Sequence, residues 1–130
     1  MSVAEVNEQF RQSLGIPRDK LKEVPVLNFL YGSLGPLWYR GYFREENGIT
    51  EPLLEQLLHT LNVSRIVVGH TSMEGVFSHF NGRVISVDSN IKRGKSGELF
   101  LWNKGNLSRG TLSGEQLPMR PLSEKEDEKD

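Results

Sequence analysis

The part of the sequence that most favours chemistry is a histidine at the end of a short apolar run, Arg65-Ile66-Val67-Val68-Gly69-His70-Thr71. The run reads as a buried strand, because apolar and β-branched residues are bounded by a charge on one side and Gly on the other. A His at the C-terminal tip of such a strand occupies the place where open α/β sheets bind ligands. Gly69 has no Cβ, so another backbone or a bound ion can come close. Taken alone, these residues favour the simpler alternative of a His hydrogen-bonded to a neighbouring loop.

The elements that must position His70 begin with helices. Ser2-Val3-Ala4-Glu5 has the form of a capping box, and apolar residues then recur at helical spacing until Gly15 ends the helix. Residues 18–31 read as short helical pieces, and an aromatic-rich segment follows over residues 37–43. The sequence therefore opens with a helical region rather than a strand.

A second helix and a series of strands follow. Thr50 can cap this helix, Pro52 suits its first turn, and five leucines after Pro52 form one apolar stripe. The hydrophobic period then changes to two, and Asn81-Gly82 gives the strongest short hairpin signal. The strands expected after the helix are 66–69, 76–80, 83–88, 98–102 and 107–112.

The composition indicates one ordinary folded domain. The 130 residues suffice for a single core, and 36% hydrophobic and 25% charged residues fit a folded domain. No apolar run approaches the length of a membrane span, and no secretory signal is visible at the start. The absence of cysteine excludes disulfides and thiolate metal sites.

The charge is divided unevenly along the chain. The tail from Glu124 to Asp130 has five acids and two lysines, which is −3, so residues 1–123 carry +2 of the total −1. A mild excess without a basic stripe does not argue for nucleic acid. We expect one domain over residues 1–122 and a charged, disordered tail over residues 123–130.

The order of these elements is unusual for a complete domain. Helices come first, then a helix–strand unit, then a β-meander, which indicates an α/β (α+β) fold class. No strand precedes the helices to complete a βαβ unit, and a sheet built from residues 64–112 alone would have an exposed edge. We therefore read the chain as the second half of a larger fold.

Several segments then resemble one family. Gly69-His70-Thr71, Gly75-Val76, residues 81–88 and Gly97-Glu98-Leu99 look like the C-terminal part of the calcineurin-like metallophosphoesterases. The segment Gly35-Pro36-Leu37-Trp38-Tyr39-Arg40-Gly41-Tyr42 is similar to the stretch before the Gly-His motif in the bacterial Shewanella-like protein phosphatases. Together these segments cover roughly residues 3–105.

The resemblance implies a metallophosphatase-type β-sandwich flanked by helices, in which two metals (Mn, Fe or Zn) bind a water that attacks a phosphate monoester. His70 would be a metal ligand through its neutral imidazole, and Arg40 would clamp the phosphate through its planar guanidinium. The alternative for Arg40 is stacking over Trp38 or Tyr42.

Two further residues follow a strand end near the implied site. Asp88 and Asn90 would line the pocket, or would hold a turn. The loop Lys92-Arg93-Gly94-Lys95 would attract a phosphorylated substrate by its charge, or would be a solvated run.

Most of the family's ligands are absent from this chain. Its Asp-x-His, Gly-Asp-x-x-Asp, Gly-Asn-His and His-Gly-Gly motifs do not occur, and the only histidines are His59, His70 and His79. A two-metal site needs several converging ligands, so we expect the isolated chain to bind no metal stably and to be inactive. The resemblance implies the C-terminal portion of a split or truncated gene, with the N-terminal half absent.

Three readings remain open from the sequence. One is the C-terminal part of a metal-dependent phosphatase, and another is a non-catalytic pseudo-phosphatase module that binds a phosphorylated ligand or protein. The third is a small structural α/β domain with no ligand. The partners would be a phosphorylated small molecule or phosphoprotein and a separate N-terminal half, with no nucleic acid and no membrane. The default location is the cytoplasm.

Overall fold

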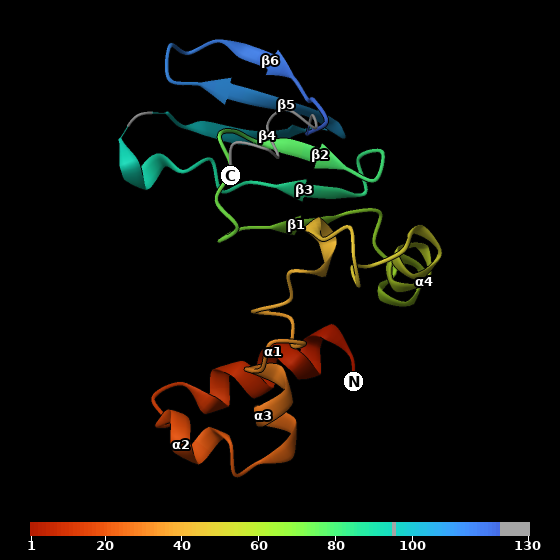
Figure 1. Cartoon of the computed structure of the whole chain (residues 1–130), viewed down its shortest axis with the longest axis vertical. Coiled ribbons are helices and arrows are strands. Elements are labelled where there is room, and N and C mark those ends of the chain that lie inside the picture. Colours follow the sequence, from red (N-terminus) through yellow and green to blue (C-terminus); the bar gives the residue numbers. More distant parts are fainter. Residues whose placement is uncertain (95, 123–130) are drawn as a thin grey trace. The chain divides into compact units, whose positions relative to one another are not determined.

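The computed structural model describes residues 1–94 and 96–122 (Figure 1). The chain forms two compact units, residues 1–61 and the residues from Asn62 onward. Helices dominate the first unit and strands the second, which confirms the general α+β class. The predicted tail over residues 123–130 lies outside the described residues, and the single domain expected over residues 1–122 stays a prediction.

The first unit is helical. Its elements are α1 (Val3–Ser13), α2 (Arg18–Leu21), α3 (Pro25–Leu30), the short 3-10 helix η1 (Gly41–Phe43) and α4 (Glu51–Leu61). Both helices predicted from capping signals are present. The Thr50 hydroxyl accepts a hydrogen bond from the Leu53 N–H at 3.4 Å, as expected for the cap of α4.

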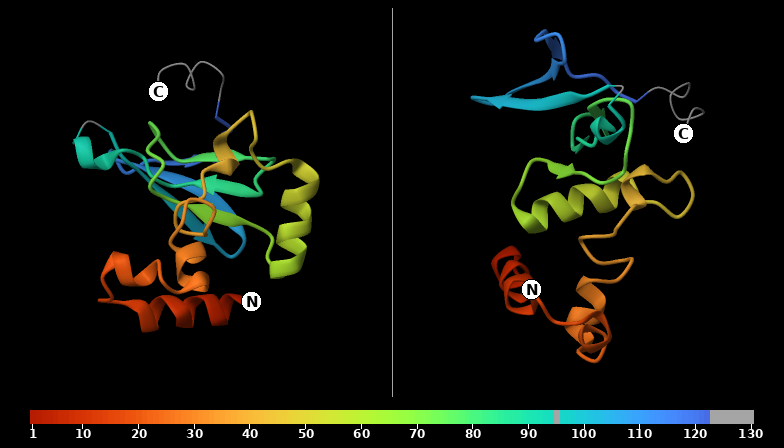
Figure 2. Two further views of the ribbon diagram at one scale, coloured as in Figure 1. Left: turned by 60° about the horizontal axis from the view of Figure 1, so that its bottom comes forward. Right: turned by 90° about the vertical axis from the view of Figure 1, so that its left-hand side faces the viewer.

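Helices α1 and α3 pack through an aromatic and polar contact. The ring centroids of Phe10 and Tyr31 lie 5.2 Å apart in an edge-to-face arrangement. The hydroxyl of the buried Ser13 lies 2.7 Å from the Tyr31 hydroxyl, so the polar ends of both residues are satisfied. Figure 2 shows α1, in red, beside α3, in orange.

The N-terminus of α1 is closed by a complete capping box. The Ser2 hydroxyl accepts from the Glu5 N–H at 3.1 Å, and the Glu5 carboxylate accepts from the Ser2 N–H at 2.6 Å. Hydrogen bonding to the Glu5 carboxylate from the Ser2 backbone N–H, and then from the Ser2 hydroxyl, lowers the pKa of Glu5.

We expect Ser2→Ala to destabilise the first unit by about 1 kcal/mol. Because the folded pKa of Glu5 is lowered, its contribution is complete above the unfolded pKa, about 4.3, and is lost as pH falls through the lower folded value. Thermal unfolding of the wild type and Glu5→Gln should therefore differ at pH 7 and converge as the pH falls below the lowered folded pKa of Glu5. Ser33→Ala, in an exposed loop, is the control; an equal loss in that variant would contradict the capping role.

The second unit contains two sheets. Its strands are β1 (Ile66–Val68), β2 (Phe77–His79), β3 (Val84–Ser86), β4 (Glu98–Asn103), β5 (Asn106–Thr111) and β6 (Gln116–Pro118), with a 3-10 helix η2 (Ile91–Arg93). One sheet has the order β1-β3-β2 and the other β4-β5-β6. Strand β1 runs parallel to β3, and the remaining pairs are antiparallel. Strand β6 was not predicted from the sequence.

The expected hairpin joins β2 to β3 through four residues. Phe80, Asn81 and Gly82 all have positive φ angles, of 51°, 59° and 87°. The Gly82 N–H donates to the His79 carbonyl at 3.1 Å, and the Arg83 N–H donates to the Phe80 carbonyl at 3.3 Å. The Asn-Gly signal is confirmed, although the turn is longer than two residues.

The core of the second unit lies on the first sheet. Val76, Phe77, Val84 and Ile85 are all fully buried. Strand β3 is buried on both faces, because Ile85 on one face and Val84 and Ser86 on the other are all at most 1% exposed. The Ser86 hydroxyl lies 3.2 Å from the Met73 sulfur. The residues that follow β1 and β3 are therefore anchored to a rigid central strand.

Candidate functional site

His70 lies where the sequence predicts, just beyond the C-terminal end of β1. Its side chain is exposed, and its backbone has a left-handed φ of 66°. Such a φ is uncommon for a residue with a Cβ and is one of the features that gather at functional sites. A Cβ at Gly69 would meet only a Val87 methyl at 3.9 Å, which is an ordinary contact. Within the described residues, no other backbone uses the room at Gly69.

Asp88 connects the loop after His70 to the loop after β3. One carboxylate oxygen accepts from the Ser72 hydroxyl at 3.0 Å, and the other accepts from the Asn90 N–H at 3.0 Å. The Asp88 carbonyl also accepts from the Met73 N–H at 2.8 Å. The Asp88–Asn90 bond spans two residues and is the geometry of an Asx turn. The turn role is observed, while the role in lining a pocket stays a prediction.

Asn90 begins the short helix η2. Its backbone is left-handed, with φ 62°. Its side-chain oxygen is buried and has no hydrogen-bond partner among the described residues. Lys92 and Arg93 in η2 are exposed, and Lys95 of the predicted basic loop lies outside the described residues. The structure thus brings Asp88 and Asn90 together at the end of the strand that neighbours β1.

Arg40 belongs to the first unit, whereas the other three predicted residues belong to the second. It is partly buried just before η1, with its guanidinium carbon 5.7 Å from the Trp38 ring centroid. It also donates a long hydrogen bond of 3.4 Å to the Trp38 carbonyl. The stacking that the sequence offered as an alternative is present. The phosphate clamp stays a prediction.

The aromatic residues around Arg40 form a packed cluster. The rings of Tyr39 and Tyr42 meet edge to face at 5.0 Å. Burial, and then the charge of Tyr39, raises the pKa of Tyr42. A Cβ at Gly41 would overlap the Tyr39 ring and hydroxyl, so only glycine fits there. Arg40 therefore lies within a segment whose neighbouring tyrosines are packed against each other.

The remaining histidines do not join His70. The His79 Nε2 lies 2.9 Å from the Ser86 hydroxyl, and His59 lies in the last turn of α4. Within residues 1–94 and 96–122, no group of three or more His, Cys, Asp or Glu residues is placed to hold a metal ion. The described residues therefore do not fit a metal site of their own, and we derive no step through a metal.

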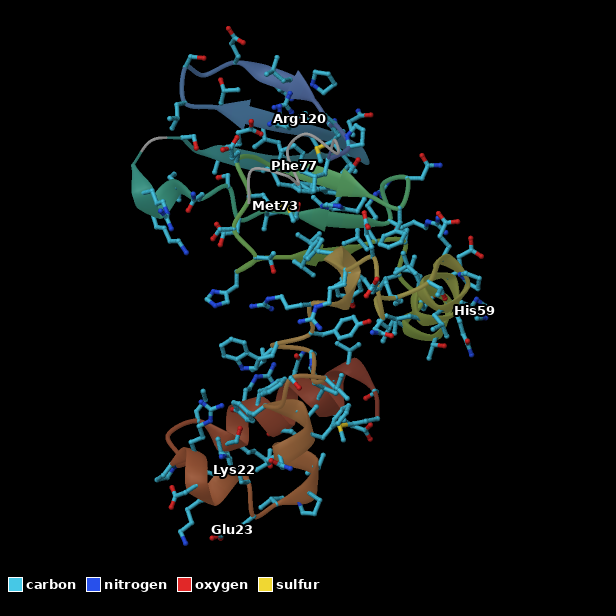
Figure 3. The ribbon with its side chains drawn as sticks, in the orientation of Figure 1. Lys22, Glu23, His59, Met73, Phe77 and Arg120 are labelled. Carbon is cyan, nitrogen blue, oxygen red and sulfur yellow. The ribbon has the colours of Figure 1, made fainter. Side chains whose placement is uncertain are left out.

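A buried ionic cluster was missed by the sequence analysis. The Glu98 Oε1 accepts from Arg109 at 2.9 Å and from Arg120 at 3.3 Å, and its Oε2 accepts from the Val76 N–H at 3.1 Å. The side chains of Glu98 and Arg109 are 13% and 9% exposed. Arg120 lies over the Phe77 ring, 4.5 Å from its centroid (Figure 3).

The Glu98 cluster connects the two sheets of the second unit. Glu98 and Arg109 lie on β4 and β5, whereas Phe77 begins β2 and Val76 directly precedes it. A Cβ at Gly75 would come within 2.6 Å of the Arg120 guanidinium, so the cluster requires glycine at this position. No local pattern marks the cluster, because its members lie 11 and 22 residues apart. The three hydrogen bonds that Glu98 accepts indicate a structural role, although the buried Arg120 Nε has no hydrogen-bond partner among the described residues.

Comparisons with known proteins point to one phosphatase. No family model matches the chain. A solved structure of the cold-active protein-tyrosine phosphatase of a psychrophilic Shewanella species is 44% identical, with a TM-score of 0.82 over 90% of this chain and 35% of that chain. A further structure of a cold-active protein tyrosine phosphatase gives the same identity and TM-score over 89% of this chain and 34% of that chain.

A curated relative comes from a yeast. An uncharacterised protein of Schizosaccharomyces pombe is 31% identical over 96 residues, which are 72% of this chain and 28% of that protein. The chain thus spans about a third of the length of the proteins it matches. Over that portion it shares the backbone arrangement of the Shewanella phosphatase.

These comparisons contradict the family assigned from the sequence. The similar structures are named protein-tyrosine phosphatases, not calcineurin-like metallophosphoesterases, and only the connection to Shewanella agrees. The metallophosphatase-type β-sandwich is not supported, nor is the two-metal, manganese-dependent hydrolysis. The described residues contain no cluster of three or more His, Cys, Asp or Glu side chains that could hold a metal ion. A specifically bacterial origin is not supported, because one match is from yeast. The comparisons do not favour the non-catalytic pseudo-phosphatase module either.

None of the described helices combines the length and the apolar content that crossing a bilayer requires.

Proposed function

We propose that this chain supplies one portion of a phosphatase that hydrolyses phosphate monoesters, with phosphotyrosine in proteins as the substrate class. The observation that supports this most is the 44% identity and TM-score of 0.82 to the cold-active protein-tyrosine phosphatase over 90% of the chain. At this identity the match extends beyond a shared fold to nearly half of the side chains. A cytoplasmic location stays a prediction.

Within this function, we propose that Arg40 binds the phosphate group of the substrate. Arg40 is partly buried, and its guanidinium carbon lies 5.7 Å from the Trp38 ring centroid, so the orientation of the side chain is restricted before any ligand arrives. A planar guanidinium can donate two parallel hydrogen bonds to phosphate oxygens, and a restricted one loses less entropy on binding. Trp38 thus acts as the support on which Arg40 is positioned.

For His70, Asp88 and Asn90 the proposal is limited to the position of His70 at the strand end. Asp88 fixes the loop that follows His70 through its bonds to Ser72 and Met73, which keeps the exposed imidazole at the strand end. The use of divalent metals by the complete enzyme, and of His70 as a ligand, stays a prediction. Its direct test is the metal content of the purified complete enzyme.

The proposed function is tested by a segment exchange. The portion of the Shewanella phosphatase that matches this chain is replaced by this chain, which leaves the rest of that enzyme unchanged. We expect the hybrid to hydrolyse a phosphotyrosine peptide. A hybrid that unfolds with the same cooperativity as the parent enzyme but shows no hydrolysis would contradict the proposal.

In this hybrid, Arg40→Gln is expected to lower kcat/KM by about 100-fold, which is typical for the loss of a residue that contacts the reacting group. Arg44→Gln, four positions later and exposed, is the matched control and should keep the activity of the hybrid. If the two variants have equal activity, Arg40 does not bind the phosphate. Steady-state kinetics on the peptide gives both kcat and KM.

A further inference from the structure

The second unit has an open apolar groove. It has a volume of about 850 Å³, and its apolar lining comes from Val63, Val67, Val87, Leu99, Phe100, Trp102 and Leu107. Four of these side chains are strongly exposed: Val63 at 44%, Val67 at 55%, Leu99 at 64% and Trp102 at 68%. An apolar patch of this kind on a protein surface is characteristic of an interaction site.

The groove adjoins the open edge of β1. In the sheet order β1-β3-β2, β1 is an outer strand, and no described strand pairs with its other side (Figure 1). The Ile66 N–H donates to the Arg83 carbonyl, and the Val68 carbonyl accepts from the Val87 N–H, so the backbone groups of both residues face β3. Because alternate residues of a parallel strand bond to opposite sides, the N–H and carbonyl of Val67 point to the open edge. Val67 thus presents both backbone groups at the edge and an exposed side chain in the groove.

An outer strand of this type is a template for another strand. The usual protections of an edge are charges, proline or a bulge, and β1 consists of Ile, Val and Val. Among the residues that line the groove, Arg65 is the only cation and lies before the strand, while Glu98 is held by its arginines. The chemistry of the groove therefore selects an extended segment with aliphatic side chains.

The comparisons indicate where such a segment comes from. The chain corresponds to 35% of the Shewanella phosphatase, so about two thirds of that protein lies outside the match. The exposed Val67 on the outer strand β1 offers a place where a strand from that unmatched part can pack. The groove suits an aliphatic strand, and the unmatched part of the Shewanella phosphatase is long enough to supply one.

We propose that the groove and the open edge of β1 bind an extended, aliphatic strand from a polypeptide equivalent to the part of the phosphatase that this chain does not cover. The strand pairs with Val67 through the backbone and places alternate side chains between Val67, Leu99 and Trp102. This inference rests on the proposed function, since it takes its partner from the phosphatase match. It concerns assembly rather than catalysis.

The test uses the chain as it is, co-expressed with the unmatched remainder of the Shewanella phosphatase as a separate polypeptide. We expect the two to purify together as a 1:1 complex. With 5-fluorotryptophan in this chain alone, the ¹⁹F signal of Trp102, assigned by Trp38→Phe, should shift on binding. The amide proton of Val67 should exchange with solvent more slowly in the complex than in the free chain.

Charged substitutions locate the surface. Val67→Lys and Leu99→Lys are each expected to weaken the complex at least tenfold, measured by competition with the untagged wild-type chain. Both side chains are exposed, so the free chain should fold as before. Leu112→Lys is the matched control, because Leu112 is 72% exposed and is not part of the groove.

Three results would overturn the inference: failure of the two polypeptides to associate, unchanged affinity in both lysine variants, or equal weakening by Leu112→Lys. A dimer of the free chain that Val67→Lys abolishes would assign the groove to a second copy and would also overturn it. The hybrid enzyme joins both parts covalently and reports activity, so its failure is distinguishable from a failure of binding.

Discussion

Replacing Glu98 with Ala is expected to destabilise the second unit by about 3–5 kcal/mol, the usual cost of removing one partner from a buried ion pair. The carboxylate accepts from two arginines and from the Val76 N–H. Its loss leaves the guanidinium of Arg109, which is 9% exposed, without its anion. Urea unfolding followed by far-UV circular dichroism measures the change in the free energy of unfolding.

Two further variants separate charge from shape. Glu98→Gln keeps an oxygen that can accept from Val76 but removes the charge, so its loss should lie between that of Ala and the wild type. Glu115→Ala removes an exposed acid of the same unit and should change stability by no more than about 0.5 kcal/mol. A loss below about 1 kcal/mol for Glu98→Ala would show that the cluster is not needed to join the sheets.

The second large effect is expected at Phe77. This side chain is 0% exposed, and the residue lies on β2, which pairs with β3. The Arg120 guanidinium lies over its ring. Phe77→Ala should cost about 3–5 kcal/mol, because it removes buried apolar surface and leaves a cavity beneath the Glu98 cluster. The same unfolding measurement applies, with the exposed Leu112→Ala as the control.

A double-mutant cycle tests whether Phe77 and Arg120 act together. If the guanidinium gains from the ring, Phe77→Ala and Arg120→Ala should be non-additive by about 0.5–2 kcal/mol. Additive losses would indicate that the two side chains are neighbours without a favourable interaction between them.

The elements with local signals could be predicted from the sequence. Helices α1 and α4 are marked by Ser2 and Thr50, whose side chains accept the expected capping bonds. The turn at Asn81-Gly82 is marked by the residues that tolerate positive φ. In each case the physical cause acts within a few residues, so the sequence alone contains it.

The elements that depend on distant partners could not be predicted. Strand β6 has only three residues and exists because β5 pairs with it. The Glu98 cluster joins residues far apart in the chain, and nothing near Glu98 indicates that Arg109 and Arg120 will reach it. Long-range pairing is set by tertiary packing, which local patterns do not encode.

The candidate site was predicted in position more than in role. His70 is exposed at the end of β1, and Asp88 and Asn90 meet in a turn beside it. Their chemical roles were taken from a family resemblance that the comparisons contradict. A short motif such as Gly-His fixes a backbone geometry, but the chemistry depends on the full set of groups around it.

The spacing of the Glu98 contacts also has a consequence for biosynthesis. Val76 precedes Glu98 by 22 residues and Arg120 follows it by 22, and the Ser78 N–H donates to the Arg120 carbonyl at 2.8 Å. All strands of the first sheet, which end at Ser86, are therefore synthesised before Arg120, the last residue of the Glu98 cluster. Closure of such distant contacts is slow compared with helix formation. Until Arg120 is synthesised, the cluster above Phe77 lacks one of its two arginines, and a stop codon at or before position 120 would remove that contact from the unit.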